Sequence, residues 1–330
     1  MKSVRLEGNR KVSIVAVDDP TPGEGEVVIR TAVSALCGSE LHGWREDGMP
    51  EGNSGHEAVG TVIAAGPNVT TPAIGQRVGV CTVSGCGTCD YCAKGQYTWC
   101  EQRSYYGSMH AEQFLASAHA CHVLPDNLSW EAGVLLTGDG FGVPYHSNTK
   151  ITPSETETVA ILGMGPIGLG HALLQSFLGR QVIAVDIVPY RLALASKLGA
   201  AHTVNATEAD VVERIKKLTA GRGVDVCVEA AGRPETAKQC FSAVRTAGLV
   251  LFNGEQSSVE LSPSEDFIRR DITATGAWFY HFSEITPMLE LYRKGLRVEA
   301  LITHHFDLAS AAEAYATFAK GETGKVILHA

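Results

Sequence analysis

Hydrophobic positions in the first third of the chain gather in short, β-branched runs. The clearest are VVIRTAVSAL at 27–36 and AVGTVIAA at 58–65, and segments rich in proline and glycine, such as DDPTPGEGE, separate them. Apolar runs of this length, bounded by turn residues, are typical of β-strands. We therefore predict a β-rich region with few helices.

From about Thr158 the pattern changes to an alternation of buried-strand runs and helical periodicity. Strands are predicted at 159–162, 181–186, 224–232 and 249–254, and helices at 166–179, 206–221 and 234–248. A strand followed by a helix and then a second strand is the βαβ unit of parallel sheets. This region is predicted to be a doubly wound parallel sheet, and the polar stretch Thr149–Glu157 before it suits a passage between domains.

Further helices and strands are predicted after about Tyr280. Helices are predicted at 282–295 and 308–321, and strand-like segments at 297–306 and 324–330. Nothing in these segments themselves indicates which domain they join.

Charge and hydropathy exclude several classes of partner. The chain of 330 residues has a formal net charge of -9 and no basic run, which argues against nucleic acid or an anionic membrane as the main partner. No segment approaches the roughly 20 consecutive apolar residues that span a bilayer. We expect a cytoplasmic protein that acts on a small molecule.

Five of the nine cysteines lie between Cys81 and Cys100, a density that favours metal over disulfides in a reducing compartment. Four of them form the spacing C-x2-C-x2-C-x7-C, namely Cys86, Cys89, Cys92 and Cys100. Such short spacers let four thiolates converge on one tetrahedral zinc that is closed to substrate. We predict a structural zinc; an iron–sulfur cluster and a redox-active thiol pair are the alternatives.

A second set of metal-binding side chains follows the apolar run that ends at Leu36. Cys37 comes directly after this run, and His56 follows in Gly-His-Glu. A thiolate and an imidazole at loop positions can share a metal while one coordination position stays free, as catalysis requires. Taken alone, residues of these types more often have a structural role, as a buried thiol or a hydrogen-bonded histidine.

A glycine-rich turn, GMGPIG, lies between the predicted strand 159–162 and the helix that follows it. Glycines at this place permit a tight turn and a close approach of a dinucleotide pyrophosphate, whose charge is stabilised at the helix N-terminus. The residues predicted to bind the cofactor here are Gly163, Gly165, Pro166, Ile167 and Gly168.

Asp186 ends the next predicted strand, about 20 residues further on, where an acid can bind the ribose 2′-hydroxyl. Because a carboxylate there repels a 2′-phosphate, NAD is the predicted cofactor. Arg191 could instead contact a phosphate or form an ion pair with Asp186. The alternative for Asp186 itself is a cap on a turn.

Together these motifs resemble the zinc-dependent medium-chain dehydrogenase/reductase family of alcohol and polyol dehydrogenases over nearly the whole chain. CGSELH at 37–42 is similar to its Cys-x-(Ser/Thr)-Asp-x-His segment, GHEAVGTV at 55–62 to its Gly-His-Glu motif, and the four-cysteine loop to its structural zinc lobe. The resemblance implies an α/β protein: a β-rich GroES-like catalytic domain from 1–145 and 281–330, and a doubly wound parallel-sheet Rossmann domain from 146–280 that binds NAD.

The resemblance also implies a third ligand for the catalytic zinc. Aligning LLTGDGFGVPYH with the family selects Asp139, where Cys or Glu is commoner; a helix cap is the alternative role. Glu57 is an alternate or transient ligand. Glu40 stands where the family usually has an Asp that supports the zinc histidine.

Three further residues take roles from the same resemblance. Ser39 and His42 match the family's relay that carries the substrate proton to solvent, although both also fit ordinary polar loop positions. Lys325, in GKVIL, is expected to reach the cofactor pyrophosphate, and a surface lysine is the alternative.

The predicted protein is an NAD-dependent alcohol dehydrogenase with two zinc ions per chain, one catalytic and one structural. It would transfer a hydride between NAD(H) and an alcohol or its carbonyl, with polyols, sugars and cyclitols among the candidate substrates. The resemblance further implies a homodimer or homotetramer. The rival class is a nucleotide-binding zinc protein of the same fold without turnover; a metal-free reductase of this fold would lack the zinc ligands.

Overall fold

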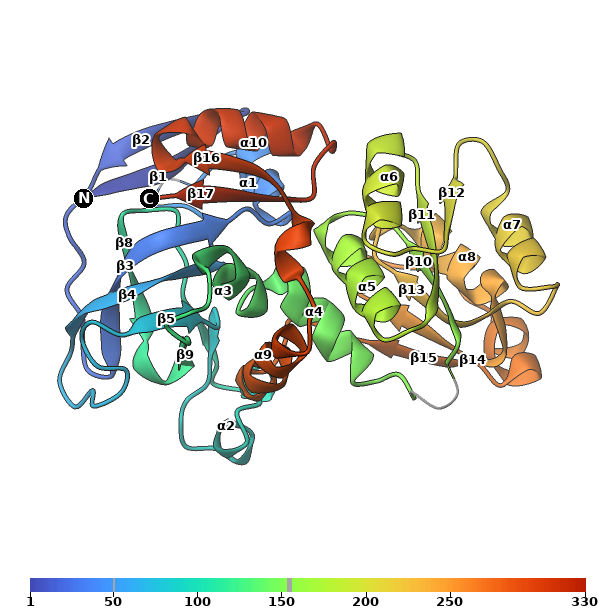
Figure 1. The fold of residues 1–330 in the computed structure, drawn as a ribbon, viewed down its shortest axis with the longest axis horizontal. Helices are drawn as coiled ribbons and strands as arrows, with labels where there is room; N and C mark the ends of the chain where they lie inside the picture. The colour runs from blue at the N-terminus through green and yellow to red at the C-terminus, as the bar shows by residue number, and fades with distance from the viewer. Residues whose placement is uncertain (50, 153–155) are drawn as a thin grey trace. The chain divides into compact units, whose positions relative to one another are not determined.

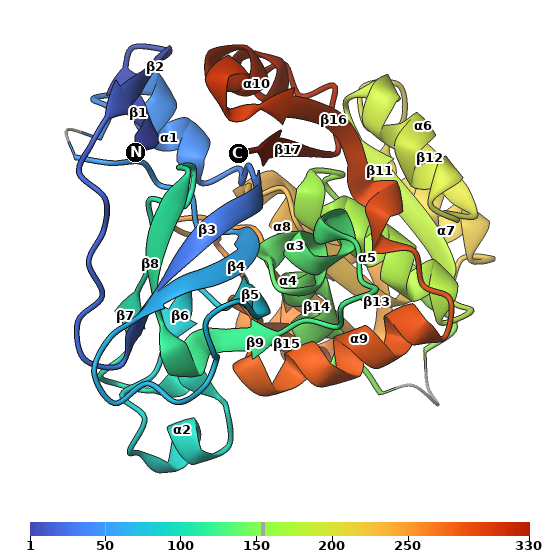
Figure 2. The same ribbon diagram turned by 60° about the vertical axis from the view of Figure 1, so that its left-hand side comes forward.

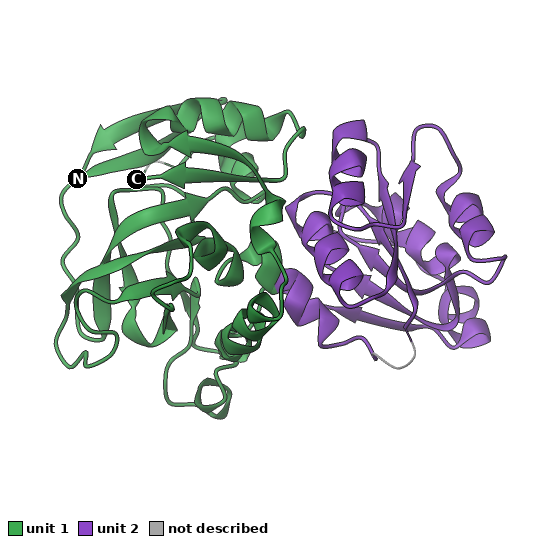
Figure 3. Cartoon of the chain, in the orientation of Figure 1, with its two compact units in different colours: residues 1–142, 279–330 green, residues 143–278 purple. Residues whose placement is uncertain are grey.

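The computed structural model describes residues 1–49, 51–152 and 156–330, so three positions of the predicted interdomain stretch, 153–155, lie outside the described residues. The chain forms two compact units (Figure 3). Unit 1 comprises residues 1–142 and 279–330, and unit 2 comprises residues 143–278. The chain therefore leaves unit 1 at 142/143 and returns at 278/279, where the sequence predicts 145/146 and 280/281.

Unit 1 is built on a mostly antiparallel sheet in the order β16-β17-β3-β4-β5-β9, with β8 also paired to β3. Only β16 and β17 within this sheet are parallel to each other. Its strands are β3 (Glu26–Ala35), β4 (Ala58–Ala65), β5 (Arg77–Val80), β8 (Gln113–Ser117), β9 (Cys121–Val123), β16 (Ile302–Asp307) and β17 (Lys325–His329). Two two-stranded sheets accompany it, β1 (Lys2–Gly8) with β2 (Lys11–Ala16), and β6 (Val83–Ser84) with β7 (Ser104–Tyr105).

The helices of unit 1 are short. They are α1 (Glu40–Arg45), α2 (Asp90–Ala93), α3 (Trp130–Leu136), α9 (Ile285–Arg293) and α10 (Ala311–Ala319), with single 3₁₀ turns at Tyr97–Trp99, Ala118–Ala120, Phe282–Glu284, Val298–Leu301 and Leu308–Ser310. Figure 2 shows α10 beside β16 and β17, which join the sheet from the end of the chain. A further helix, α4 (Asp139–Asn148), begins in unit 1 and ends in unit 2.

Unit 2 has the doubly wound architecture that the alternating pattern predicts. Its sheet has the order β12-β11-β10-β13-β14-β15, and every neighbouring pair is parallel. The chain moves outward from β10 to β12, then crosses to β13 on the other side of β10 (Figure 1). Right-handed crossovers therefore place α5 and α6 on one face of the sheet and α7 and α8 on the other.

The strands of unit 2 are β10 (Thr158–Leu162), β11 (Gln181–Asp186), β12 (His202–Asn205), β13 (Val224–Glu229), β14 (Val244–Phe252) and β15 (Thr273–Gly276). The helices are α5 (Pro166–Phe177), α6 (Pro189–Lys197), α7 (Val211–Leu218) and α8 (Pro234–Ala243), with a π turn at Pro263–Phe267 and a 3₁₀ turn at Ile268–Arg270. The helix predicted to run to 248 is wrong beyond Ala243, because Val244 pairs with Val224 and already belongs to β14.

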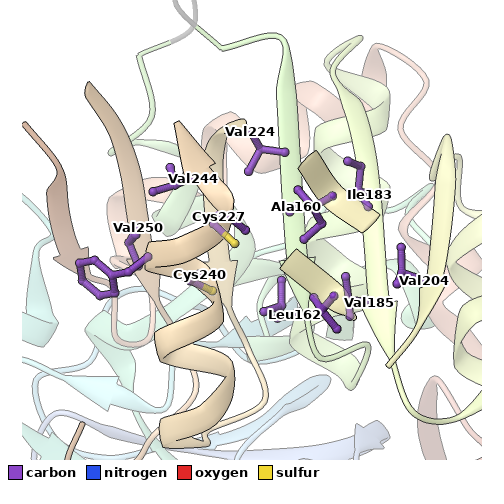
Figure 4. Close-up of a cluster of buried hydrophobic side chains, with 14 of the residues drawn as sticks. Ala160, Leu162, Ile183, Val185, Val204, Val224, Cys227, Cys240, Val244 and Val250 are labelled. Carbon is purple, nitrogen blue, oxygen red and sulfur yellow. The ribbon is translucent and has the colours of Figure 1, made fainter. Parts of the chain in front are cut away.

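The core of unit 2 explains why its strands read as uninterrupted apolar runs. All five residues of β10 are buried, and its Ala160 and Leu162 pack with Ile183 and Val185 of β11 in one cluster (Figure 4). Residues of α7 and α8 close this cluster, among them Ile215, Phe241 and Cys240. Strands covered on both faces need no polar positions, so alternation disappears from the sequence. Among the described residues, no helix combines the length and apolar character needed to cross a membrane.

Candidate metal and cofactor sites

The four predicted thiol ligands meet in a lobe of unit 1 around α2. The sulfur atoms of Cys86, Cys89, Cys92 and Cys100 all lie within 4.8 Å of one another. The Sγ atoms of Cys89 and Cys92 are 3.5 Å apart, and those of Cys86 and Cys92 are 3.9 Å apart. Thiolates on a tetrahedral zinc at about 2.3 Å would be separated by about 3.8 Å, so the cluster has the dimensions of a zinc site.

The thiols of this lobe differ in acidity. Burial first, and then the neighbouring thiols, raise the pKa of Cys92 to about 12, whereas hydrogen bonds from Thr88 lower the pKa of Cys86 to about 6. All nine cysteines of the chain are free thiols, so the four of the lobe are available as metal ligands. Apart from the lobe and Cys37, the cysteines are Cys81, Cys121, Cys227 and Cys240, and all four are buried.

A second group forms where three segments of unit 1 converge. Cys37 follows the end of β3, His56 and Glu57 precede β4, and Asp139 begins α4; one ligand atom from each lies within 4.8 Å of the others. The backbone N–H of Ala35 donates to the carbonyl of Glu57 at 2.9 Å, which holds the end of β3 against the start of β4. Sheet pairing thus brings together residues that lie far apart in the sequence.

His56 is oriented by a hydrogen bond on each ring nitrogen. Its Nδ1 contacts the Ser54 carbonyl at 2.8 Å, and its Nε2 lies 3.1 Å from Asp139 Oδ2. Burial by itself lowers the pKa of His56, but the Asp139 carboxylate and the Cys37 sulfur outweigh burial and raise it well above the usual value. This group of side chains therefore attracts a positive charge, whether a proton or a metal ion.

Glu57, a member of this group, forms a fully buried ion pair with Lys325. Lys325 Nζ lies 2.5 Å from Glu57 Oε1 and donates to the Leu36 carbonyl at 3.0 Å, while Gly140 N–H donates to Glu57 Oε2 at 3.3 Å. Burial raises the pKa of Glu57, and the positive charge of Lys325 offsets only part of this rise. Burial lowers the pKa of Lys325, but the negative charge of Glu57 outweighs burial and the pKa of Lys325 is raised. The surface position considered for Lys325 is wrong, since only 1% of its surface is exposed. Its contact with the pyrophosphate stays a prediction.

Glu40 does not take the supporting role expected for it. Its Oε1 accepts from the Cys37 N–H at 2.8 Å and its Oε2 lies 2.9 Å from His110 Nε2, with Tyr315 OH donating to the same oxygen. Burial raises the pKa of Glu40, but the attraction of His110 outweighs it and the pKa falls to about 2. Since His56 is held by Ser54 instead, the longer side chain of Glu40 supports the loop that carries Cys37.

The two predicted relay residues lie in the turn and first helix after Cys37. Ser39 precedes α1 and is exposed. His42 is 78% exposed, and its Nε2 lies 3.2 Å from Glu46. Both positions are open to solvent, and a proton path through them stays a prediction.

The glycine-rich turn lies between β10 and α5 in unit 2, as its motif predicts. Gly163 has φ +98°, a conformation that side chains rarely adopt, and Gly168 packs so closely that a Cβ there would lie 1.8 Å from the Gly163 carbonyl oxygen. Gly165 caps the helix, which begins with Pro166 and Ile167. The N–H groups at the start of a helix of 12 residues suit a phosphate.

Asp186 ends β11 and organises the same turn. Its Oδ2 accepts from the Met164 N–H at 2.6 Å, and its Oδ1 accepts from the Val188 N–H at 2.9 Å. Arg191 Nη1 lies 3.8 Å from Asp186 Oδ2, so the ion pair considered for these residues is present. Asp186 therefore combines a carboxylate at the strand end with a structural role in the turn.

Two domain families match the chain in the order of these sites. The alcohol dehydrogenase GroES-like domain family matches residues 23–126, and the zinc-binding dehydrogenase family matches residues 166–294. An uncharacterized zinc-type alcohol dehydrogenase-like protein of Escherichia coli is 31% identical, with 100% of this chain and 98% of that protein covered. L-threonine 3-dehydrogenase of Pyrococcus furiosus is 32% identical (95% and 94% covered), and sorbitol dehydrogenase of Bacillus subtilis is 29% identical (95% and 92% covered).

Solved structures of similar sequence share the fold over the whole chain. The alcohol dehydrogenase of Thermus sp. ATN1 superposes with a TM-score of 0.87 at 29% identity, covering 100% of this chain and 99% of that one. An Escherichia coli alcohol dehydrogenase complexed with NADH gives 0.89 at 25% identity, and a Sinorhizobium meliloti protein bound to NADP gives 0.88 at 26%, each covering 100% and 99%. The chain belongs to the zinc-dependent medium-chain dehydrogenase family, with a GroES-like domain and a Rossmann-like parallel sheet, and is an oxidoreductase.

Proposed function

We propose that the protein is a zinc-dependent, NAD-linked dehydrogenase that interconverts a polar alcohol and its carbonyl compound. The observation that carries this proposal is the convergence of Cys37, His56 and Asp139 with Glu57, all with a ligand atom within 4.8 Å of the others, in a chain of the zinc-dependent family. In this assignment unit 1 is the catalytic domain and unit 2 binds the cofactor.

The donor set of the second group fits a catalytic zinc. One thiolate, one imidazole and one carboxylate are all zinc ligands, and three protein ligands leave a coordination position for substrate. Asp139 and Cys37, which raise the pKa of His56, would favour a divalent cation at the same position. Glu57, paired with Lys325, is the nearest further carboxylate and the candidate for a transient fourth ligand.

Each residue of the site then has a distinct task. A zinc held by Cys37, His56 and Asp139 would supply the Lewis acid that polarises the substrate oxygen, while NAD would supply the hydride acceptor. Ser39 Oγ would take the proton of the substrate hydroxyl while giving up its own proton toward His42, whose exposed ring would release it to solvent.

The named relatives support a proposal for the substrate class. Sorbitol dehydrogenase and L-threonine 3-dehydrogenase are named for alcohols that carry a second polar group next to the reacting hydroxyl. We propose a substrate of this kind, a polyol, sugar, cyclitol or hydroxy amino acid, with a homodimer or homotetramer as the working assembly.

Metal content and a substrate panel test the proposal together. Two zinc ions per chain, with reduction of NAD by at least one polar secondary alcohol, is the expected result. Two zinc ions without turnover on any alcohol would favour the rival, a nucleotide-binding zinc protein without activity. A single zinc ion per chain would contradict the proposed catalytic zinc site.

Cofactor choice gives a separate prediction at Asp186. Asp186→Ala should raise the KM for NAD about 10- to 100-fold, since a charged hydrogen bond contributes roughly 1.5–3 kcal/mol, and should relax discrimination against NADP. Because the same carboxylate accepts two backbone N–H groups, Asp186→Asn is the matched variant, which keeps an acceptor and removes the charge. Steady-state kinetics with both cofactors measure the effect. An unchanged NAD/NADP ratio in both variants would contradict the assignment of Asp186 to the ribose.

The cysteine lobe gives another prediction. Cys92→Ser should release one of the two zinc ions and make the loop around 85–100 sensitive to protease, since metal binding and folding are coupled in such lobes. Cys121→Ser is a matched control, because a hydroxyl there can still donate to the Ser117 carbonyl that Cys121 contacts. Retention of both zinc ions by the Cys92 variant would contradict the assignment of Cys92 as a zinc ligand.

A further inference from the structure

A third group of metal-binding side chains lies in unit 1 and takes no part in the proposed reaction. It consists of Glu131 at the start of α3, His305 on β16 and His329 on β17, and one ligand atom of each lies within 4.8 Å of the others. His305 is exposed, and the other two are partly buried. None of the three belongs to the cysteine lobe or to the group around Cys37.

The pairing of β16 with β17 sets the position of the two histidines. In the parallel register His305 lies opposite Ile327 and Asp307 opposite His329. Because side chains alternate between faces, His305 and His329 are diagonal neighbours on one face of the sheet. Their rings stack with a centroid distance of 5.5 Å and an interplanar angle of 12°.

The distance between the two imidazoles fits a shared metal ion. His305 Nδ1 lies 3.1 Å from His329 Nε2. Two imidazole nitrogens bound to one ion at 2.0–2.1 Å would be roughly 2.9–3.4 Å apart for octahedral or tetrahedral angles. An ion could therefore enter between the rings with little movement of either strand. The competing arrangement is a hydrogen bond in which one neutral ring donates its N–H to the other.

We propose that Glu131, His305 and His329 form a binding site for a divalent transition-metal ion such as zinc. Two imidazole nitrogens favour an ion of this class over magnesium or calcium, which prefer oxygen ligands, and the carboxylate supplies negative charge. The exposure of His305 leaves the remaining coordination positions to water. A bound ion would tie the edge strand β16 to β17 and to α3, and would stabilise unit 1 without entering the hydride transfer.

Zinc titration of the metal-loaded protein tests this site. Protein with its resident zinc, freed of excess metal, is titrated with Zn²⁺ by calorimetry, and its thermal unfolding is followed at each step. The unsubstituted protein is expected to bind one additional equivalent and to unfold at a higher temperature as zinc is added. His305→Ala and His329→Ala should abolish both effects, and Glu131→Gln should weaken binding about tenfold.

His304→Ala is the matched control, because it removes the adjacent histidine of the same strand, whose side chain lies on the opposite face. It should behave as the unsubstituted protein. Since the His305 side chain is exposed, His305→Ala should fold normally and decides the outcome even if the His329 variant does not. Equal zinc uptake by His305→Ala, or no additional equivalent in the unsubstituted protein, would overturn the proposal and leave a hydrogen-bonded histidine pair.

Discussion

Cys37→Ser is expected to lower turnover by at least about 10³-fold while leaving the affinity for NAD nearly unchanged. Loss of one of three ligands weakens or removes the metal, whose polarisation of the substrate oxygen is worth several kcal/mol of barrier, and each 1.4 kcal/mol is about tenfold in rate. The cofactor turn at Gly163–Gly168 belongs to unit 2, whereas Cys37 belongs to unit 1, so the dinucleotide contacts should survive.

Three measurements on the same preparation make this test specific: zinc content, kcat, and NADH binding by fluorescence. Zinc should fall from two ions to one, and Cys121→Ser, the control used for the cysteine lobe, should retain both ions and full activity. Unchanged turnover in the Cys37 variant would remove the catalytic zinc from the mechanism. Loss of NADH binding along with activity would instead indicate misfolding.

The sequence predicts well those sites whose residues lie close together along the chain. The four thiols of the lobe lie within one short loop, so their spacing already limits the geometry, and the structure brings all four within 4.8 Å. The glycine-rich turn is predicted for the same reason, because a strand, three glycines and a helix follow one another directly. Strands β3 and β4 are also recognisable as continuous apolar runs.

Helices without a polar face are harder to recognise. The five positions Ala132–Leu136 of α3 are all buried, so the helix has none of the three- to four-residue periodicity that marks an amphipathic helix. Helix α4 contains Pro144 and two glycines, which read as a turn. The hydrophobic pattern predicts neither helix, and only the helix cap considered for Asp139 implies one at α4.

Partnerships across long sequence separations leave no local signal. Tyr315 donates to Glu40 across 275 positions, and Lys325 contacts Glu57 across 268. The family resemblance assigned Glu40 to the zinc histidine, but the longer side chain reaches His110 instead, a residue that nothing in the sequence distinguishes. The pairing of β17 with β3 and the packing of α10 against α1 create these contacts, and no property of the separate segments encodes them.

Lys325→Met is expected to destabilise unit 1 by about 3–5 kcal/mol, because it leaves the buried carboxylate of Glu57 without its counter-charge. Removing both charges should cost less stability, because a buried ion pair contributes little net stability once its desolvation is counted. The double variant Lys325→Met/Glu57→Gln should therefore recover most of the loss. Free energies of chemical unfolding for the two single variants and the double variant, at fixed zinc concentration, measure the coupling.

The pH dependence of the single variant gives a second readout. Lys325 lowers the pKa of Glu57, whereas burial and Asp139 raise it, so removing Lys325 moves the carboxyl further above its ordinary value of 4.5. A carboxyl group whose pKa is higher in the folded state than in the unfolded state contributes to folding stability below its unfolded pKa. This contribution is lost as the pH rises through its folded pKa. Lys325→Met should thus be closer to the unsubstituted protein near pH 5 than near pH 8.

The double variant also separates the two roles of Lys325. If its ammonium contacts the pyrophosphate, the KM for NAD should stay raised after stability has recovered; if its only task is to neutralise Glu57, the KM should return to the parent value. Equal destabilisation by the single and double variants would show that the two charges are not coupled. In that case packing around the lysine stem, and not the ion pair, would hold this part of unit 1 together.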